Sequence, residues 1–477
     1  MIHRRACGSG RGASSGMPSK KAQAGDKHPA NTDPGMNHCR TTGVLRSEHL
    51  TTGAPLALTT KLLPDLPSTL DDVADWVSRN LGGYHSGAAR RSGAFVGGQA
   101  AADLALSELD ITGYAGTRSQ VHPPHTRGAS KLSPYIRHGL LPLPRVREAS
   151  TATGSSYDQF RFGGELLWQD YSRHWYAAEG SATRTGVNRH PVTATTQLQM
   201  DPWRNSMACM TATMDELHDD GWVVNQARMW LATQWTVRGG RDWRDGEDHM
   251  FRHLLDGSRA ANRQGWQWVV GGTRDRAYGL ARRQVLKRAP AYCDRCEIRD
   301  DCPIKSYAKY SVGAAIAQDG FGDLRSQFGP LDTPVNPEAR QPEAVWLTAE
   351  SLGDGDPALS AHPHLPAVFT FDSALLKGLM LDGKRLVFLA ECLADLAARR
   401  PVNCFIGDPV EALGDRSVAV TYAPVPGFRR HAARLTLHEP TLQPWPWLRR
   451  PTTALFERLH SSSTFPSFRD WCRLTKP

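Results

Sequence analysis

The hydrophobic pattern of this chain changes its period near residue 330, and that change constrains the fold more than any other feature. From Ser68 to about Tyr310, apolar residues recur at spacings of three and four, which predicts helices throughout. A Pro-rich stretch follows at 330–342. Beyond it, apolar runs with the spacing of buried strands begin at Val345, Ala367, Val402 and Val418, and an amphipathic helix is predicted over 384–400. Strand–helix–strand alternation predicts a parallel, doubly wound sheet.

The fold class is therefore predicted as mainly α, with a helical domain followed by a small α/β domain. Residues 1–61 carry nine Lys and Arg against three Asp and Glu, so +6 of the net charge of +9 lies there. Such a segment is expected to be disordered. The predicted boundaries are a basic tail over 1–65, a helical domain over 66–325, a linker over 326–342 and an α/β domain over 343–477.

Composition excludes several classes of protein. No apolar run approaches the roughly 18–20 residues that a membrane helix needs. The nine Cys are spread irregularly, so a secreted disulfide framework is not expected. The opening segment has no apolar stretch typical of a secretory signal. A cytoplasmic monomer without a membrane partner is the expectation.

Three groups of residues could carry chemistry. Ser130 and Ser133 precede a predicted helix, where hydroxyls and free N–H groups suit a phosphate, although a helix cap would look the same. Glu165, Trp168 and Gln169 share one helix face, as do Asn225, Arg228 and Met229. By spacing alone, each of these groups could equally belong to the core or to an ordinary surface.

The combination of motifs is more specific than any one of them. Five blocks occur in a fixed order: Ala129-Ser-Lys-Leu-Ser-Pro-Tyr, Glu165-Leu-Leu-Trp168, Gly221-Trp-Val-Val-Asn225-Gln-Ala-Arg-Met229, Asp242-Trp-Arg-Asp-Gly-Glu247, and Asp256…Asn262…Gly265-Trp-Gln-Trp268. Their order and spacing resemble the FAD-binding domain of photolyases and cryptochromes over roughly residues 98–310.

This resemblance implies roles for individual residues. Asn262 would face the flavin N5, and Arg228 would pair with Asp256 over the flavin ring. The phosphates and ribityl chain of FAD would be contacted by Tyr114, Ser130, Lys131, Leu132 and Ser133. The pocket for a flipped-out pyrimidine dimer would be lined by Glu165, Trp168, Asn225, Met229 and Trp268. Trp266 and Trp243 would relay electrons, with Trp203 and Trp230 as candidates for the outermost step.

The sequence also departs from the family pattern. Arg is usual where this chain has Lys131, Gln169 and Gln226, and a second Asp is common where it has Ser258. Replacing Arg by Gln near the lesion removes a bidentate contact to phosphate or base. The resemblance therefore leaves the substrate and the efficiency of repair open.

A cysteine cluster follows the flavin blocks. Cys293, Cys296 and Cys302 lie close in the sequence, and their spacing permits an Fe–S site, a structural zinc site or unpaired thiols. Cys209 is the natural fourth ligand. The iron–sulfur bacterial members of the family take a fourth Cys from a similar place, so the resemblance favours a 4Fe-4S cluster, with zinc as the alternative.

In this family an α/β antenna domain normally precedes the FAD domain. Here the sequence after residue 343 resembles that domain in a shortened form, which suggests a swapped domain order. Whether it binds an antenna chromophore or serves only for packing stays open. The expected function is light-dependent repair of UV-damaged DNA by electron transfer from reduced FAD. The alternatives are a cryptochrome-type photoreceptor and a flavin-binding protein with neither activity.

Overall fold

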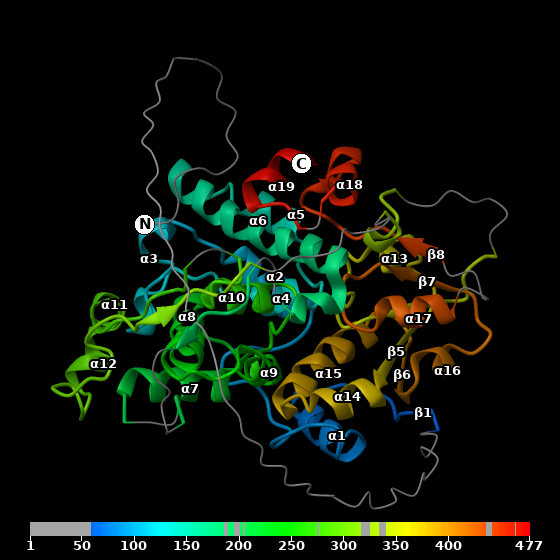
Figure 1. Ribbon diagram of the computed structural model, residues 1–477. Coiled ribbons are helices and arrows are strands. Elements are labelled where there is room, and N and C mark those ends of the chain that lie inside the picture. The colour runs from blue at the N-terminus through cyan, green and yellow to red at the C-terminus, as the bar shows by residue number, and fades with distance from the viewer. Residues whose placement is uncertain are drawn as a thin grey trace, which may run out of the picture. The chain divides into compact units, whose positions relative to one another are not determined.

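The structure is a computed structural model that describes residues 59–185, 189–194, 201–203, 206–273, 276–315, 325–332, 340–435, 441–462 and 464–477. The predicted tail over 1–58 lies outside the described residues. Helices follow one another along the chain up to residue 294, whereas the apolar spacing predicts the helical pattern to about Tyr310 (Figure 1). They are α1 (Val73–Asn80), α2 (Gln99–Ser107), α3 (Tyr114–Thr117), α4 (Ser133–Arg137), α5 (Leu143–Ala149), α6 (Ser156–Glu179), α7 (Ala208–Asp220), α8 (Asn225–Thr233), α9 (Trp243–His253), α10 (Ala261–Val269), α11 (Arg282–Arg288) and α12 (Pro290–Asp294). Residues 295–309 form turns and loop, and Tyr310 begins a short strand.

Shorter turns join some of these helices. The 3₁₀ turns are η1 (Leu70–Asp72), η2 (Pro124–Thr126), η3 (Gly180–Arg184) and η5 (Arg325–Phe328), η4 (Gln234–Arg238) is a π turn that continues α8, and β2 (Thr193–Ala194) pairs with β3 (Tyr310–Ser311).

Apolar residues over 214–236 recur at spacings of three and four, which is typical of a single helix, but the stretch is divided between α7 and α8. Gly221 caps α7 in the left-handed region (φ 69°), where a residue without Cβ is favoured. Trp222, Val223 and Val224 follow and are buried. The helix therefore restarts at Asn225, which becomes the first residue of α8.

The predicted parallel sheet is present. Its strands run in the order β1-β6-β5-β4-β7-β8, and β4 to β8 each pair with their neighbours in parallel. They are β1 (Lys61–Leu62), β4 (Ala344–Leu347), β5 (Ala367–Asp372), β6 (Val402–Gly407), β7 (Val418–Thr421) and β8 (Thr441–Gln443). The chain builds outward from β4 first on one side and then on the other, which is the doubly wound topology. β1, from the end of the predicted tail, pairs antiparallel with β6.

Aspartates mark where helices of the α/β part begin. Asp356, Asp372, Asp382 and Asp408 each accept backbone N–H groups from the first turn of the helix that follows. Such caps are worth about 1 kcal/mol each. The helices of this part are α13 (Pro357–Ala361), α14 (Ser373–Leu379), α15 (Gly383–Ala397), α16 (Pro409–Leu413), α17 (Phe428–Arg434), α18 (Thr453–His460) and α19 (Phe468–Leu474), and β9 (Arg450–Pro451) pairs with β10 (Thr475–Lys476).

One helix joins the sheet to the flavin blocks. α15 is buried from Gly383 to Ala394 and packs on α1, α2, α9 and β6. A second apolar core lies around Trp175 of α6, Trp346 of β4 and Trp471 of α19. Phe328, which falls in the predicted linker, is fully buried in this second core. Among the described residues, no helix combines the length and the hydropathy that crossing a membrane requires.

Candidate active site

Three of the predicted flavin residues converge on one point. Arg228 of α8 donates from a terminal guanidinium nitrogen to Asp256 Oδ2 at 2.8 Å, and its other terminal nitrogen lies 3.5 Å from Asn262 Oδ1 of α10. The Arg228 and Asp256 side chains are 14% and 5% exposed. Asp256 Oδ1 and Asn262 Nδ2 are buried, and neither has a hydrogen-bond partner among the described residues. Buried polar groups are costly to leave without a hydrogen bond. The acceptor of Asp256 and the donor of Asn262 therefore fit a polar heterocycle such as a flavin.

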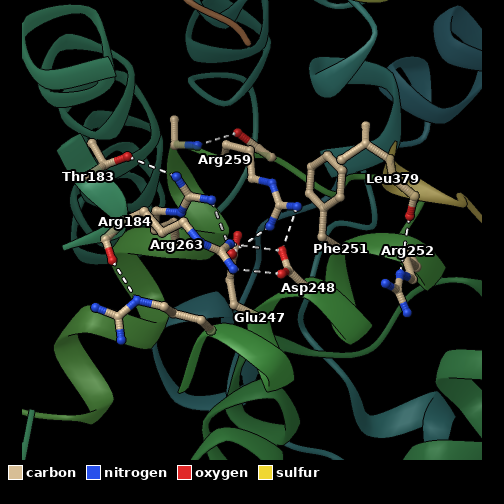
Figure 2. Close-up of polar contacts among 12 residues, drawn as sticks. Thr183, Arg184, Glu247, Asp248, Phe251, Arg252, Arg259, Arg263 and Leu379 are labelled. Carbon is tan, nitrogen blue, oxygen red and sulfur yellow. Dashed lines mark hydrogen bonds and ion pairs between the residues drawn. The ribbon is translucent and has the colours of Figure 1, made fainter. Parts of the chain in front are cut away.

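A buried ionic network holds the segment that carries Asp256 and Asn262 (Figure 2). Glu247 of α9 is fully buried, and its Oε2 accepts from Arg259 at 2.5 Å and from Arg263 at 3.2 Å. Arg263 also donates to Thr183 Oγ1 at 3.0 Å. Arg259 and Arg263 lie on either side of Asn262 in the sequence, so their ion pairs with Glu247 hold the segment that carries Asn262 in place.

The same segment is held from its other side. The carbonyl oxygen of Gly257 accepts from Arg137 Nε of α4 at 2.8 Å and from Arg385 of α15 at 3.3 Å. Asp256 therefore lies between the helical domain and α15 of the α/β part. Ser258, where the family often has Asp, accepts from the backbone N–H of Ala260 at 3.1 Å.

The predicted phosphate segment lies at the start of α4. Lys131 has a left-handed backbone (φ 57°), Leu132 is 1% exposed, and Ser133 is the first residue of the helix. Trp222 Nε1, just before α8, donates to Ser133 Oγ at 2.9 Å. Together with the bond from Arg137 to Gly257, this contact brings the segment next to the Arg228–Asp256 pair.

The residues that cap the N-terminus of α6 also hold the short helix α3, which begins at Tyr114. The carboxylate of Asp158 accepts from Ala115 N at 2.8 Å and from the Ser155 hydroxyl at 2.7 Å, which ties α3 to the start of α6. The Tyr114 ring packs edge-on against Phe162 at 5.1 Å. Burial, together with the charge of Glu165, raises the pKa of Tyr114, so it is a neutral phenol near the site.

The predicted lesion-pocket residues come from three helices that pack together. α10 contacts both α6 and α8. Met229 Cε lies 3.6 Å from where a side chain on Gly265 would begin, and the Trp268 ring lies 5.1 Å from that of Tyr278. Glu165 pairs with Arg118 at 3.2 Å and keeps 38% of its side chain exposed. Asn225 is exposed at the start of α8.

Gln226, one of the departures from the family pattern, donates to the Tyr278 hydroxyl at 2.6 Å. The position where the family pattern has Arg is thus used for an internal contact. Gln169, the other departure from Arg to Gln, is partly buried on α6 beside Trp168.

Trp168 has an aromatic partner that no sequence pattern indicated. The ring of Phe468, at the start of α19, stacks on it with centroids 3.9 Å apart and planes 11° apart. Tyr171 contacts both rings and donates its hydroxyl to the Pro466 carbonyl at 2.7 Å. α19 therefore covers one face of Trp168, and Figure 1 shows this last helix beside α6.

The tryptophans form a connected group. Trp266 is 3% exposed, and its ring lies 6.5 Å from Trp203, which lies 4.4 Å from Trp235. Trp243, predicted as a relay residue, is also buried, and Arg244 lies over its ring at 5.0 Å. Trp230, the other candidate for the outermost step, is fully buried on α8, whereas Trp235 is partly exposed.

The four predicted metal-binding cysteines gather where α7 meets α12. Cys209 lies in the first turn of α7, Cys293 lies in α12, and Cys296 and Cys302 follow in the loop. Burial, reinforced by the other three thiols, raises the pKa of Cys209 to about 12. The four cysteines thus lie in one region of the fold, at the contact of α7 with α12 and in the loop that follows α12.

Comparison with known proteins agrees with this geometry. Residues 162–286 match the family model described as the FAD binding domain of DNA photolyase. The chain is 29% identical over 251 residues to a deoxyribodipyrimidine photo-lyase of Synechococcus sp., covering 48% of this chain and 47% of that protein. It is 33% identical over 183 residues to one of Thermus thermophilus, covering 35% and 40%.

A solved structure of a Synechocystis sp. cryptochrome is similar at 24% identity and a TM-score of 0.38, with 43% of this chain and 46% of that chain covered. The chain thus spans less than half the length of the curated relatives that it matches. The matched region contains the Arg228–Asp256–Asn262 centre. Residues 162–286 of this chain are therefore similar to the FAD binding domain of DNA photolyase.

Proposed function

We propose that this protein is a light-dependent DNA repair flavoprotein, which splits pyrimidine dimers in UV-damaged DNA. The observation that carries the proposal is the convergence of Arg228, Asp256 and Asn262, with a buried acceptor and a buried donor still to be satisfied. The similarity to deoxyribodipyrimidine photo-lyases supports the choice of reaction.

FAD would supply the light-driven electron for dimer cleavage. The protein's own residues would bind and orient it. Asn262 would present its amide to the flavin ring, and the Arg228–Asp256 ion pair would fix the ring's position. The phosphates and the ribityl chain would be held by Ser130, Lys131, Leu132, Ser133 and Tyr114. The contacts of Ser133 with Trp222 and of Arg137 with Gly257 support this role, because they hold the start of α4 near the Arg228–Asp256 pair.

The lesion would enter the space bounded by α6, α8 and α10. A dimer inside a duplex cannot reach a buried cofactor, so the damaged bases have to be flipped out. Trp168 offers an aromatic face for stacking, and Met229 and Trp268 offer apolar walls. Glu165 and Asn225 carry the exposed polar groups that could bond to the base edges.

Trp168→Ala tests this pocket. Stacking of a base on an aromatic side chain is worth roughly 1–3 kcal/mol, so affinity for a dimer-containing oligonucleotide should fall about 5- to 150-fold. Tyr157→Ala is a matched control, because Tyr157 lies on the same helix but is 61% exposed. Binding by fluorescence anisotropy and light-dependent repair are measured for both variants. Unchanged affinity in Trp168→Ala would remove Trp168 from the pocket.

A cryptochrome-type photoreceptor is the second candidate. Phe468 already stacks on Trp168, and two Arg positions are occupied by Gln169 and Gln226, one of which serves an internal contact. A photoreceptor would keep the flavin and the tryptophans without selecting damaged DNA. Equal affinity of the parent protein for damaged and undamaged DNA, with no repair in light, would favour it over a photolyase.

The cysteines are proposed to hold a 4Fe-4S cluster, with zinc as the alternative. Thiolates are the usual ligands of such clusters. Among the described residues, only a group of three histidines has its ligand atoms close enough together for a single ion as they stand. For the cysteines, the resemblance to the iron–sulfur members of the family is what favours the cluster over zinc.

Iron and sulfide analysis of anaerobically purified protein distinguishes a 4Fe-4S cluster from a zinc site. We expect about four iron and four sulfide per chain, as the composition of a 4Fe-4S cluster requires, and a loss of most of both in Cys209→Ser. Cys404→Ser is the matched control, since Cys404 is also buried but lies in β6. Zinc without iron, of which one equivalent is lost in Cys209→Ser, would convert the site to a zinc site.

The α/β part is proposed to be a shortened antenna-like domain placed after the FAD domain. Its doubly wound strand order supports this assignment. The cavity lined by Glu350, Asp356, Arg173 and Trp445, at the carboxyl end of β4, has a volume of about 20 Å³. That space admits a water molecule and not an aromatic chromophore.

A further inference from the structure

Three histidines outside the flavin site lie together between α7 and α9. His218 is in the last turn of α7, and His249 and His253 are four residues apart on α9. Side chains at that spacing share one face of a helix. Because α7 packs against α9, that face meets His218 (Figure 1).

The separations of their nitrogens suit a common metal ion. His218 Nε2 and His249 Nε2 are 3.4 Å apart. Two nitrogens that each lie 2.0–2.1 Å from a tetrahedral zinc are about 3.3 Å apart. One ligand atom from each of the three residues lies within 4.8 Å of the others. A small inward movement of His253 would complete three positions of a tetrahedron.

The third histidine is already oriented by a carboxylate. His253 Nδ1 lies 3.1 Å from Asp382 Oδ2, which leaves its Nε2 side for the cluster. Histidines that bind metals commonly donate their second nitrogen to such a carboxylate, which fixes the ring and its tautomer. Asp382 also caps α15 and accepts from Lys384 Nζ at 3.1 Å, so its position is set by the fold.

The surrounding charges permit a cation. The carboxylate of Asp382 stands directly behind His253. The nearest positive groups are engaged elsewhere: Lys384 is paired with the other oxygen of Asp382, and Arg90 bonds to the His218 carbonyl and to Asp219. All three histidines are partly exposed, so a water molecule can reach a fourth position.

We propose that His218, His249 and His253 bind a divalent transition-metal ion, zinc in the first instance, with water as the fourth ligand and Asp382 as the positioning carboxylate. Three imidazoles with an open position suit zinc and its neighbours rather than magnesium or calcium, which prefer oxygen ligands. The ion would link α7 to α9 and, through Asp382, to α15. This site is separate from the cysteine cluster and from the flavin.

Metal content tests the proposal. Chelator-treated holoprotein is dialysed against micromolar Zn²⁺ and its zinc is counted by mass spectrometry, with FAD content as a check of folding. We expect the parent protein to bind one equivalent of zinc. His249→Gln and His253→Gln should lose it, and Cys209→Ser should retain it. His460→Gln is the matched control, since His460 is exposed on α18. Asp382→Asn should weaken zinc binding roughly 10- to 100-fold. Unchanged zinc in both histidine variants would overturn the proposal.

A measurement on the parent protein keeps the test decisive if a variant fails to fold. Cu²⁺ bound by imidazoles shows nitrogen hyperfine structure in its electron paramagnetic resonance spectrum, and Co²⁺ bound by thiolates shows an intense charge-transfer band that imidazoles do not give. The site predicts the nitrogen pattern for the first equivalent of Cu²⁺ added to protein whose cysteine site is filled. A spectrum without nitrogen coupling would exclude the three histidines.

Discussion

Replacing Glu247 by alanine is expected to destabilise the protein by about 3–5 kcal/mol and to abolish retention of FAD. Glu247 is the only described carboxylate that both Arg259 and Arg263 bond, and all three side chains are at most 9% exposed. Removing Glu247 would leave the buried charge of Arg263 without a described carboxylate, and would leave Arg259 with Asp248 alone, at 2.6 Å. A buried charge without a partner is the costly case. Since Arg259 and Arg263 flank Asn262, the flavin contact should be lost together with the stability.

The measurement is urea unfolding of FAD-free protein, with flavin absorbance of the purified protein as a second readout. Asp245→Ala is the matched control, because Asp245 lies on the same helix and is exposed. Its effect should stay within about 0.5 kcal/mol, as for other surface substitutions. Retention of both full stability and full FAD in Glu247→Ala would show that the network does not hold the flavin segment.

Much of the site could be predicted because its residues stand in ordered motifs. Arg228, Asp256 and Asn262 come from three segments, and the family resemblance that the ordered blocks carry implied that they would meet at the flavin. The strands and α15 were also predicted, since apolar runs and helical spacing are local signals. Where the helical pattern over 214–236 proved to be two helices, the break lies at a glycine in a left-handed conformation.

Other contacts in and around the site could not be predicted, because they join segments that lie apart in the sequence. Phe468 lies 300 residues after Trp168, and neither residue carries a signal for the other. The same holds for Glu247 with Arg263, for Lys61–Leu62 with β6, and for His218 with the pair on α9. His249 and His253 do stand at i and i+4, and that spacing was a usable sign of a shared ligand.

Replacing Trp266 by phenylalanine is expected to slow photoreduction of bound FAD by roughly tenfold or more. A phenyl ring is much harder to oxidise than an indole, and a step made uphill by only 1.4 kcal/mol is already about tenfold slower. Trp266 lies on α10, four residues after Asn262, and is buried. Trp447→Phe, in the other apolar core, is the matched control and should leave the rate unchanged.

The family pattern and the geometry of this chain suggest different residues as the electron donor to Trp266. The resemblance assigns the second step to Trp243, but Trp203 makes a ring contact with Trp266, with centroids 6.5 Å apart. Trp235 then lies 4.4 Å from Trp203, and its partly exposed ring reaches the protein surface. Gly246 makes this arrangement possible, because a Cβ there would collide with the Trp266 ring and lie 2.8 Å from Trp235.

We therefore expect Trp203→Phe to slow photoreduction more than Trp243→Phe does. Transient absorption after a light pulse measures the rate, and flavin absorbance before the pulse confirms that each variant still binds FAD. A loss in Trp243→Phe with a normal rate in Trp203→Phe would return the second step to Trp243. If both variants keep the parent rate while Trp266→Phe loses it, the electron reaches Trp266 from another donor. In that case the contact with Trp203 serves only the packing of the segment around Trp203 against α10.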